Sequence, residues 1–224
     1  MTVGAVTGLA AEATVAREIG FEAMAGGGSA AGTEAAATAL LVRPVIGLVS
    51  FGIAGGLAPG LQSGALLLPA AVRARSGAAY WVDVEWHLRL GAAARKAGLA
   101  VTVGGMLGSE AIAATATEKA ALYAETNAVA VDLESHLVAA VAQRARVPFV
   151  VLRAVADPAE RDLPPAALLP LTGTGRPNLP RVLLSLARHP RQMTALLTLA
   201  GETKRALEAL RRAGQILRSE LQRP

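Results

Sequence analysis

Short apolar segments alternate with helical stretches along most of this chain, and the alternation limits the folds it can adopt. Segments suited to buried strands stand at residues 2–8, 45–52, 65–72, 101–108, 128–132 and 149–156. Stretches suited to helices lie between them, at residues 10–19, 33–42, 84–98, 115–125 and 133–145. Strands that alternate with helices of about 10–15 residues predict a three-layer α/β domain, with helices on both faces of one sheet.

The sequence predicts one domain with a helical tail. No internal repeat or low-complexity linker divides residues 1–224, and residues 178–224 are expected to form a basic, helical C-terminal extension. The glycine-rich residues 26–32 predict a turn, and Thr33 is the expected N-cap of the helix that follows.

Acidic residues follow closely on two of the apolar segments. Asp132 and Glu134 come after residues 128–131, and Asp157 comes after residues 149–156. A buried carboxylate is costly unless it has a partner, and ligands of open α/β sheets bind at the carboxyl ends of strands. We therefore expect these acids to lie at a ligand-binding edge of the sheet, together with Glu12 from the first loop and helix.

Each of these acids also has a purely structural explanation. Asp157 precedes Pro158 and suits a turn, while Glu12 and Glu134 suit the first turn of a helix, where an acid stabilises the dipole. The glycine-rich segment 53–60, IAGGLAPG, lacks the Gly-Lys-Ser/Thr ending of a P-loop. A ligand site is favoured by the combination at one sheet edge, whereas a Rossmann-like domain whose acids are only caps remains the structural alternative.

The composition argues against several kinds of site. The chain has no cysteine, which excludes disulfides and thiolate metal sites, and its histidines do not stand at ligand spacing. We therefore expect neither a metal nor a bound cofactor. No apolar run reaches the roughly 18–20 residues of a membrane span, and no basic region precedes the first apolar run. A cytoplasmic protein is the expectation.

Basic residues are concentrated in the C-terminal tail. The formal net charge is +5, and the segment from Arg176 to Pro224 contains ten basic and three acidic residues. Such a tail suits either a solvated helix face or peripheral contact with the anionic inner face of a membrane. Aromatic residues make up only 3% of the chain and no nucleic-acid-binding motif is present, so nucleic acid is not an expected partner.

Four segments together resemble the superfamily of purine nucleoside phosphorylases and nucleosidases, especially the methylthioadenosine/adenosylhomocysteine nucleosidases. VGAVTGLAAE carries Glu12 where the family has a loop glutamate, and IAGGLAPG resembles the family's Ser-Ala-Gly-Gly-Leu loop. VDLE at 131–134 resembles Val-Glu-Met-Glu, and VPFVVLRAVAD at 147–157 resembles Val-Pro-Phe-x-x-x-Arg-x-x-Ser-Asp. The resemblance implies a three-layer αβα nucleoside phosphorylase-like fold with a mixed central sheet.

A narrower resemblance is to the hopanoid-associated phosphorylases of bacteria. The segments that carry it are VTGLAAEA, SFGIAGGL, AVDLESH, RAVADPAERDLPPAAL and LTGTGRPNLPRVLLSLARHP. That subgroup is taken to remove adenine from adenosylhopane in hopanoid lipid biosynthesis. The resemblance implies a nucleoside–lipid substrate, cleavage by hydrolysis or phosphorolysis, and a homo-oligomer such as a dimer.

The resemblance also implies roles for single residues. Asp157 would be the general acid at N7 of adenine, Glu134 would hold the ribose hydroxyls, and Glu12 would activate water if the reaction is hydrolysis. Such a division suits the chemistry, because a leaving base needs an acid while the sugar, which becomes oxocarbenium-like, needs negative charge or acceptors.

Further binding residues follow from the same resemblance. Leu133 would underlie the ribose, and the backbone near Phe149 and Val150 would lie against the purine. The expected set is completed by Asp132, Gly8, Ile53, Ala54 and Gly55.

The chain departs from the family in ways that affect the nucleophile and the base. Ile53 replaces a serine that binds phosphate or the nucleophile, which favours water, whereas the name of the subgroup favours phosphate as co-substrate. GSEAIAA at 108–114 stands near the family's Gly-Asp-x-Phe, so adenine would rest on aliphatic side chains. Two other functions remain open: a nucleosidase for a soluble purine nucleoside such as methylthioadenosine, and a non-catalytic nucleoside-binding protein.

Overall fold

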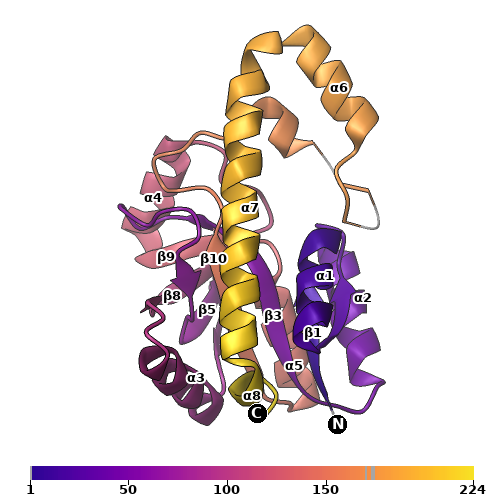
Figure 1. The fold of residues 1–224 in the computed structure, drawn as a ribbon, viewed down its shortest axis with the longest axis vertical. Coiled ribbons are helices and arrows are strands. Elements are labelled where there is room, and N and C mark those ends of the chain that lie inside the picture. The colour runs from indigo at the N-terminus through magenta and orange to yellow at the C-terminus, as the bar shows by residue number, and fades with distance from the viewer. Residues whose placement is uncertain (1, 170, 173–174) are drawn as a thin grey trace.

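The computed structural model describes residues 2–169, 171–172 and 175–224, which form a ten-stranded mixed sheet with helices on both faces (Figure 1). The strands are β1 (Thr2–Thr7), β2 (Glu22–Ala25), β3 (Val45–Gly56), β4 (Leu66–Leu67), β5 (Ala71–Ala74), β6 (Ala79–Trp81), β7 (Val101–Thr102), β8 (Gly105–Gly108), β9 (Ala128–Asp132) and β10 (Phe149–Val155). Their order is β6-β5-β8-β9-β3-β10-β4-β7, and β1 pairs with β2 and β3. The predicted three-layer α/β fold is confirmed.

Helices cover the two faces of the sheet. They are α1 (Ala10–Ile19), α2 (Ala30–Leu41), α3 (Val84–Lys96), α4 (Ala116–Thr126), α5 (Ser135–Ala145), α6 (Leu179–Arg188), α7 (Met193–Ile216) and α8 (Arg218–Leu221), with short 3₁₀ turns η1 (Pro165–Leu168) and η2 (Pro190–Gln192). Helix α7 lies against α1, β10 and β3, whereas α5 lies against α2 and the other side of β3 (Figure 1). None of the described helices is both long and apolar enough to cross a membrane.

The C-terminal tail divides into two parts that differ in burial. Helix α7 buries Ala206, Leu210 and Ala213 completely, and they belong to the same hydrophobic cluster as Val3 in the first strand. Helix α6, in contrast, has no buried residue. The basic tail therefore combines a helix of the core with a helix that stands away from it.

Two expected strands are each divided in the structure. Residues 65–72 form β4 and β5 on either side of Pro69, and residues 101–108 form β7 and β8 on either side of Gly104. In each case the chain passes from one part of the sheet to another, since β4 pairs with β10 and β7 whereas β5 pairs with β6 and β8. Strands β2 and β6 were not predicted, because both are short and largely half-buried or exposed.

The expected N-cap of the second helix is wrong. Helix α2 begins at Ala30, and the Ser29 hydroxyl caps it by accepting a hydrogen bond from the Gly32 N–H at 3.2 Å. Thr33 instead lies inside the helix, and its buried Oγ1 has no hydrogen-bond partner among the described residues. Serine after a glycine run is a good N-cap, so the segment GGGS carried the correct signal.

The topology brings distant parts of the chain to one edge of the sheet. Strands β1, β3 and β10 are parallel, so Gly8 and Asp157 lie beyond the carboxyl ends of β1 and β10, and Ile53 lies near that of β3. The end of β3 also pairs antiparallel with β9, with Gly55 opposite Val131. This pairing places Asp132 and Glu134 at the same edge.

Candidate functional site

A cavity of about 300 Å³ lies at this edge and contains most of the residues that the sequence singled out. Of the predicted set, Gly8, Glu12, Ile53, Ala54, Gly55, Asp132, Leu133, Glu134 and Asp157 all line it. The volume lies at the lower end of the range for small-molecule sites. The acids that end the two buried strands therefore meet around one space.

The expected contact of Phe149 and Val150 with a base is wrong. Both residues are buried in the hydrophobic core at the start of β10, where they pair with Leu48 and Val49 of β3. The cavity lies at the other end of this strand, beyond Val155. The family motif runs the whole length of the strand, so only its last residues reach the ligand edge.

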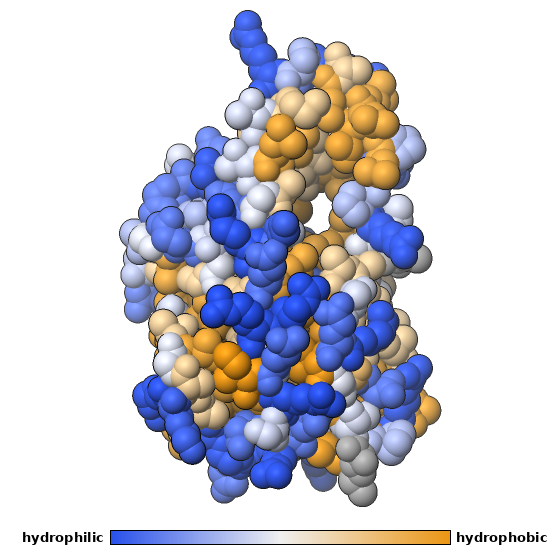
Figure 2. Space-filling model, in the orientation of Figure 1, coloured by the Kyte–Doolittle hydropathy of each residue, from blue (hydrophilic) through white to orange (hydrophobic). Residues whose placement is uncertain are grey.

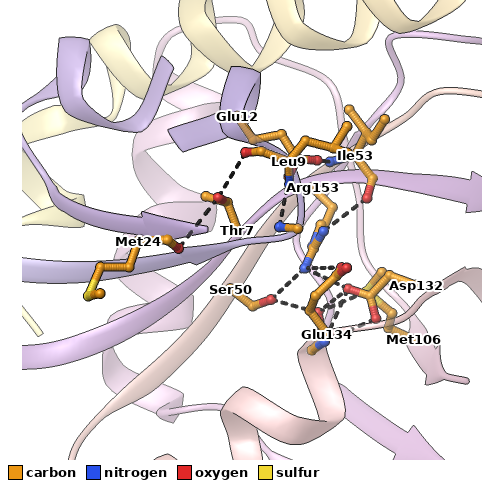
Figure 3. A network of polar contacts seen from close by, with 12 residues as sticks. Thr7, Leu9, Glu12, Met24, Ser50, Ile53, Met106, Asp132, Glu134 and Arg153 are labelled. Carbon is orange, nitrogen blue, oxygen red and sulfur yellow. Dashed lines mark hydrogen bonds and ion pairs between the residues drawn. The ribbon is translucent and has the colours of Figure 1, made fainter. Parts of the chain in front are cut away.

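Arg153 is the centre of a buried polar network at the cavity (Figure 3). Its guanidinium lies 2.8 Å from an Asp132 carboxylate oxygen and 3.2 Å from a Glu134 carboxylate oxygen. It also donates to the Ile53 carbonyl at 3.0 Å and to the Ser50 hydroxyl at 2.8 Å. One side chain therefore connects β10 with β3 and with the turn between β9 and α5.

Asp132 supports this network from the start of α5. Its carboxylate accepts hydrogen bonds from the backbone N–H and the hydroxyl of Ser135, and the Ser135 hydroxyl lies 2.9 Å from that of Ser50. Its oxygens thus have fixed donors from two sides. We assign Asp132 mainly to holding Arg153 and the first turn of α5, although it also borders the cavity.

Carboxylates outnumber the cation in this cluster. Arg153 faces Asp132, Glu134 and Glu12, and all four side chains are buried. Burial raises the pKa of Glu134 to about 8; Arg153 opposes this rise, and repulsion from Asp132 and Glu12 adds to it. Burial also raises the pKa of Glu12 against the opposing effect of Arg153. The cluster around Arg153 therefore retains a proton near neutral pH.

Glu12 is held at the start of α1 by three backbone groups. Its Oε2 accepts from the N–H of Gly8 at 2.9 Å and of Leu9 at 2.7 Å, and its Oε1 accepts from Ile53 N–H at 2.7 Å. Gly52 makes this approach possible, because a Cβ at that position would lie 2.5 Å from Oε1 of Glu12. The carboxylate is thereby fixed in the cavity wall by groups that cannot rotate away.

Asp157 occupies a different electrostatic environment from the glutamates. Its carboxylate pairs with the fully buried Lys119 of α4, with Nζ 2.6 Å from Oδ2. Burial raises the pKa of Asp157 above its ordinary value, while Lys119 opposes this rise. The site therefore contains two separate acidic groups, one around Arg153 and one beside Lys119.

The remaining wall of the cavity is aliphatic. Ala111, Ile112 and Ala113, from the segment that replaces the family's aromatic motif, line the cavity beside Asp157 and Leu163. This arrangement suits the contact between adenine and aliphatic side chains that the sequence predicts. The described residues include no group of three or more side chains suited to holding a metal ion.

Sequence analysis missed three features of the site. The first is Arg153, whose signal is that a lone arginine in an otherwise apolar strand must find carboxylate partners. Lys119 gave no comparable signal, because a lysine in a helical stretch is usually exposed. Leu199 and Thr203 of α7 reach the cavity from the tail, which no local pattern indicates.

A second and larger cavity adjoins the first. It has a volume of about 660 Å³ and lies between η1, α6 and α7. The two cavities share the wall residues Leu9, Ile53, Ala167, Leu169, Leu171, Leu199 and Thr203. Its other lining residues include Leu179, Val182, Leu196 and Leu207, so most of its surface is apolar. The first cavity, called the polar cavity because four acidic side chains border it, thus shares a wall with the larger one, whose charged lining residues are Lys204, Glu208 and Arg211.

Comparison with known proteins identifies the family. The model of the phosphorylase superfamily matches residues 23–168. The chain belongs to this superfamily, and it is an enzyme of the class that the sequence predicts, one that cleaves nucleoside N-glycosyl bonds. Among the curated proteins, none matches the sequence of this chain.

Solved structures share the fold at low sequence identity. The 5′-methylthioadenosine/S-adenosylhomocysteine nucleosidase of Neisseria meningitidis, in complex with methylthio-immucillin-A, has a TM-score of 0.73 and 16% identity, covering 97% of this chain and 99% of its own. The futalosine hydrolase of Helicobacter pylori has a TM-score of 0.74 and 15% identity, covering 98% of this chain and 97% of its own. At such identities the likeness establishes the fold.

The raised pKa of Glu134 predicts a pH-dependent cost to folding. The unfolded chain releases this proton near the ordinary glutamate pKa, whereas the folded protein keeps it up to about pH 8. Wild-type stability should therefore fall, relative to Glu134→Gln, as the pH rises from 5 to 8, and the difference should level off above 8. Urea unfolding at pH 5, 7 and 9 measures it. Glu34→Gln, at an exposed residue of α2, is the control, and a pH-independent difference would contradict the prediction.

Proposed function

We propose that this member of the phosphorylase superfamily hydrolyses the N-glycosidic bond of adenosylhopane and releases adenine in hopanoid lipid biosynthesis. The observation that carries the proposal is the pairing of the two cavities. The polar cavity contains Asp157, Glu134 and Glu12, and it shares a wall with a larger cavity that is rich in leucine. A nucleoside suits the first cavity and a hydrocarbon attached to its sugar suits the second.

The polar cavity supports a specific division of the chemistry. Asp157 gives its proton to the departing purine, and its raised pKa favours the protonated form that this step needs. Glu134 accepts hydrogen bonds from the ribose hydroxyls, and in its ionised form it stabilises the positive charge that develops on the sugar. Leu133 and Ile53 supply apolar surface around the ribose.

Water is favoured over phosphate as the nucleophile. The N–H groups of Gly8, Leu9 and Ile53 are the backbone donors that an anion would use at the start of α1, and all three already donate to Glu12. Ile53 contributes no hydroxyl to this part of the wall. A carboxylate fixed beside the sugar repels phosphate and can accept a proton from water, so Glu12 is assigned as the general base.

The second cavity supports a lipid as the other part of the substrate. Its volume of about 660 Å³ exceeds what a small substituent on the ribose would fill, and its walls are rich in leucine. Burial of a rigid hydrocarbon there would gain roughly 25 cal/mol for each Å² of apolar surface removed from water. A soluble nucleoside would leave this apolar surface uncovered.

Helix α6 supports peripheral contact with the membrane that holds such a lipid. Leu179, Leu183 and Leu184 are between 51% and 66% exposed, and Figure 2 shows apolar surface gathered over α6 at the upper right. Arg181 and Arg188, on the same helix, are exposed and would meet anionic headgroups. We propose that α6 lies on the bilayer, beside the opening of the lipid cavity. The expected homodimer stays a prediction.

The proposed function predicts a specific reaction. The purified protein should release adenine from adenosylhopane dispersed in detergent, and Asp157→Asn should lower the rate about a hundredfold or more, since it removes the general acid. Added phosphate should not change the rate. Chromatography of released adenine measures both effects.

Matched controls decide among the alternatives for this reaction. Asp162→Asn, at an exposed aspartate outside the cavity lining, should retain activity. Release that requires phosphate would establish phosphorolysis, and release from methylthioadenosine alone would assign a soluble nucleoside. No release from either substrate would leave a binding protein and contradict the catalytic proposal.

A second prediction concerns the lipid cavity. Ala200 of α7 lines only the larger cavity, so Ala200→Trp should fill part of it and raise KM for adenosylhopane about tenfold or more through overpacking. The KM for any soluble nucleoside that the protein accepts should not change. Ala195→Trp, at an exposed position of α7 outside both cavities, is the matched control. An equal effect of the two variants would refute a lipid in this cavity.

A third prediction concerns membrane contact. The double variant Leu183→Ser and Leu184→Ser should sediment less with vesicles that contain phosphatidylglycerol, and neither form should bind phosphatidylcholine vesicles strongly. Helix α6 buries none of its residues, so the fold should tolerate both changes. Leu88→Ser removes an equally exposed leucine from α3, at the other end of the molecule (Figure 1). Binding that survives in the double variant would exclude α6 as the contact.

A further inference from the structure

Lys119 lies behind Asp157 and has no part in the mechanism proposed so far. Its ammonium group donates to Oδ2 of Asp157 at 2.6 Å, to the Pro158 carbonyl at 3.0 Å and to the Arg161 carbonyl at 2.8 Å. An ammonium has three N–H donors, so these contacts satisfy it completely. The side chain is 0% exposed and does not line the cavity. It contacts the acid and the loop that follows, while the substrate space lies on the other side of Asp157.

The burial of Lys119 is not explained by stability. An ion pair taken out of water gains little over a well-packed apolar pair, because the two charges lose their hydration. A leucine or methionine in this buried position of α4 would need no charged partner. The placement of the charge therefore points to Asp157 itself.

We propose that Lys119 is a positioning residue for the acid step, holding Oδ2 of Asp157 so that Oδ1 faces the purine and stabilising the carboxylate that remains afterwards. This inference rests on the proposed function, since it concerns the same site. Lys119 touches no reacting atom and acts only through Asp157. Its contacts with the carbonyls of Pro158 and Arg161 fix the loop on which the acid stands.

The step balances in atoms and charge. The bond between the sugar carbon and the purine nitrogen breaks, and its electron pair stays with the purine. Oδ1–H of Asp157 transfers its proton to the purine, and the new carboxylate is paired with the Lys119 ammonium. Water forms the new bond to the sugar carbon and gives its proton to Glu12. After adenine leaves, Asp157 takes up a proton from solvent and Glu12 releases one, which restores both groups.

Lys119 is the cation in direct contact with the acid, and acidic groups surround the pair. Burial raises the pKa of Asp157, Lys119 lowers it, and Glu202 of α7 raises it further. Glu202 is itself paired with Arg161 at 2.8 Å. The other titratable groups that face this pair or share the cavity are Glu160, on which the charge of Lys119 acts, and Glu12, Asp132 and Glu134. Removal of the Lys119 charge should therefore raise the pKa of Asp157 beyond its present value.

The pH profile of kcat/KM tests this role with Lys119→Met and Lys119→Arg. In Lys119→Met, kcat should fall about 10- to 100-fold, the loss expected for one hydrogen bond to a charged group. The alkaline limb should move up by about one to three pH units, because Asp157 keeps its proton longer. KM should stay unchanged in Lys119→Met. Lys119→Arg should retain much of the wild-type kcat, with the alkaline limb of its pH profile at the wild-type position. A fall in kcat with an unmoved limb would reduce Lys119 to a structural role and overturn the proposal.

A second measurement does not depend on turnover. Infrared titration of ¹³C-labelled aspartate carboxyls, with Asp157→Asn to assign the band, should show Asp157 titrating at higher pH in Lys119→Met than in wild type. Equal titration in the two proteins overturns the proposal even if the enzyme acts on another substrate. Absence of adenine release together with the shifted titration would refute the proposed function but leave the Lys119–Asp157 coupling established. Circular dichroism and thermal unfolding check that each variant is folded.

Discussion

The burial of one guanidinium among three carboxylates governs the ligand edge of this protein. Arg153 joins β10 to β3 through the Ile53 carbonyl and the Ser50 hydroxyl, and to the start of α5 through Asp132 and Glu134. Loss of one partner from such a buried pair typically costs about 3–5 kcal/mol, because the other charge is left uncompensated. The three segments that form the polar wall are therefore fixed relative to one another. A site with this anchor is organised before any ligand enters.

The same anchor explains why the cavity has two kinds of acid. One cation cannot neutralise three carboxylates, so burial and mutual repulsion raise the pKa of Glu134 to about 8. Asp157 is separated from this cluster and is balanced by Lys119 instead. Acids with different partners can hold different protonation states at one pH, which is how an active site divides acid and base roles.

Much of this site could be predicted from the sequence because its residues follow directly on recognisable strands. VDLE and VPFVVLRAVAD place three acids near strand ends. The parallel pairing of β10 with β3 and the antiparallel pairing of β9 with the end of β3 bring those ends together. The sequence did not indicate which end of a strand faces the cavity, nor which residues far apart in the chain form pairs. Phe149 and Val150 share a motif with Asp157 but stand at the opposite end of the strand. Lys119 looks like a surface residue until α4 packs over the loop that carries the acid.

The tail shows why composition alone misjudges a segment. The sequence predicts it as a basic, helical extension of the single domain, and composition does not indicate that α7 buries Ala206 and Leu210 in the main core. The same helix turns Leu196 and Ala200 toward the apolar cavity, so one helix both completes the core and forms the wall of the second site. Substitutions on the side of α7 that lines the larger cavity can therefore alter this cavity without opening the core. Helix α6, which buries nothing, is the part of the tail free to meet another surface.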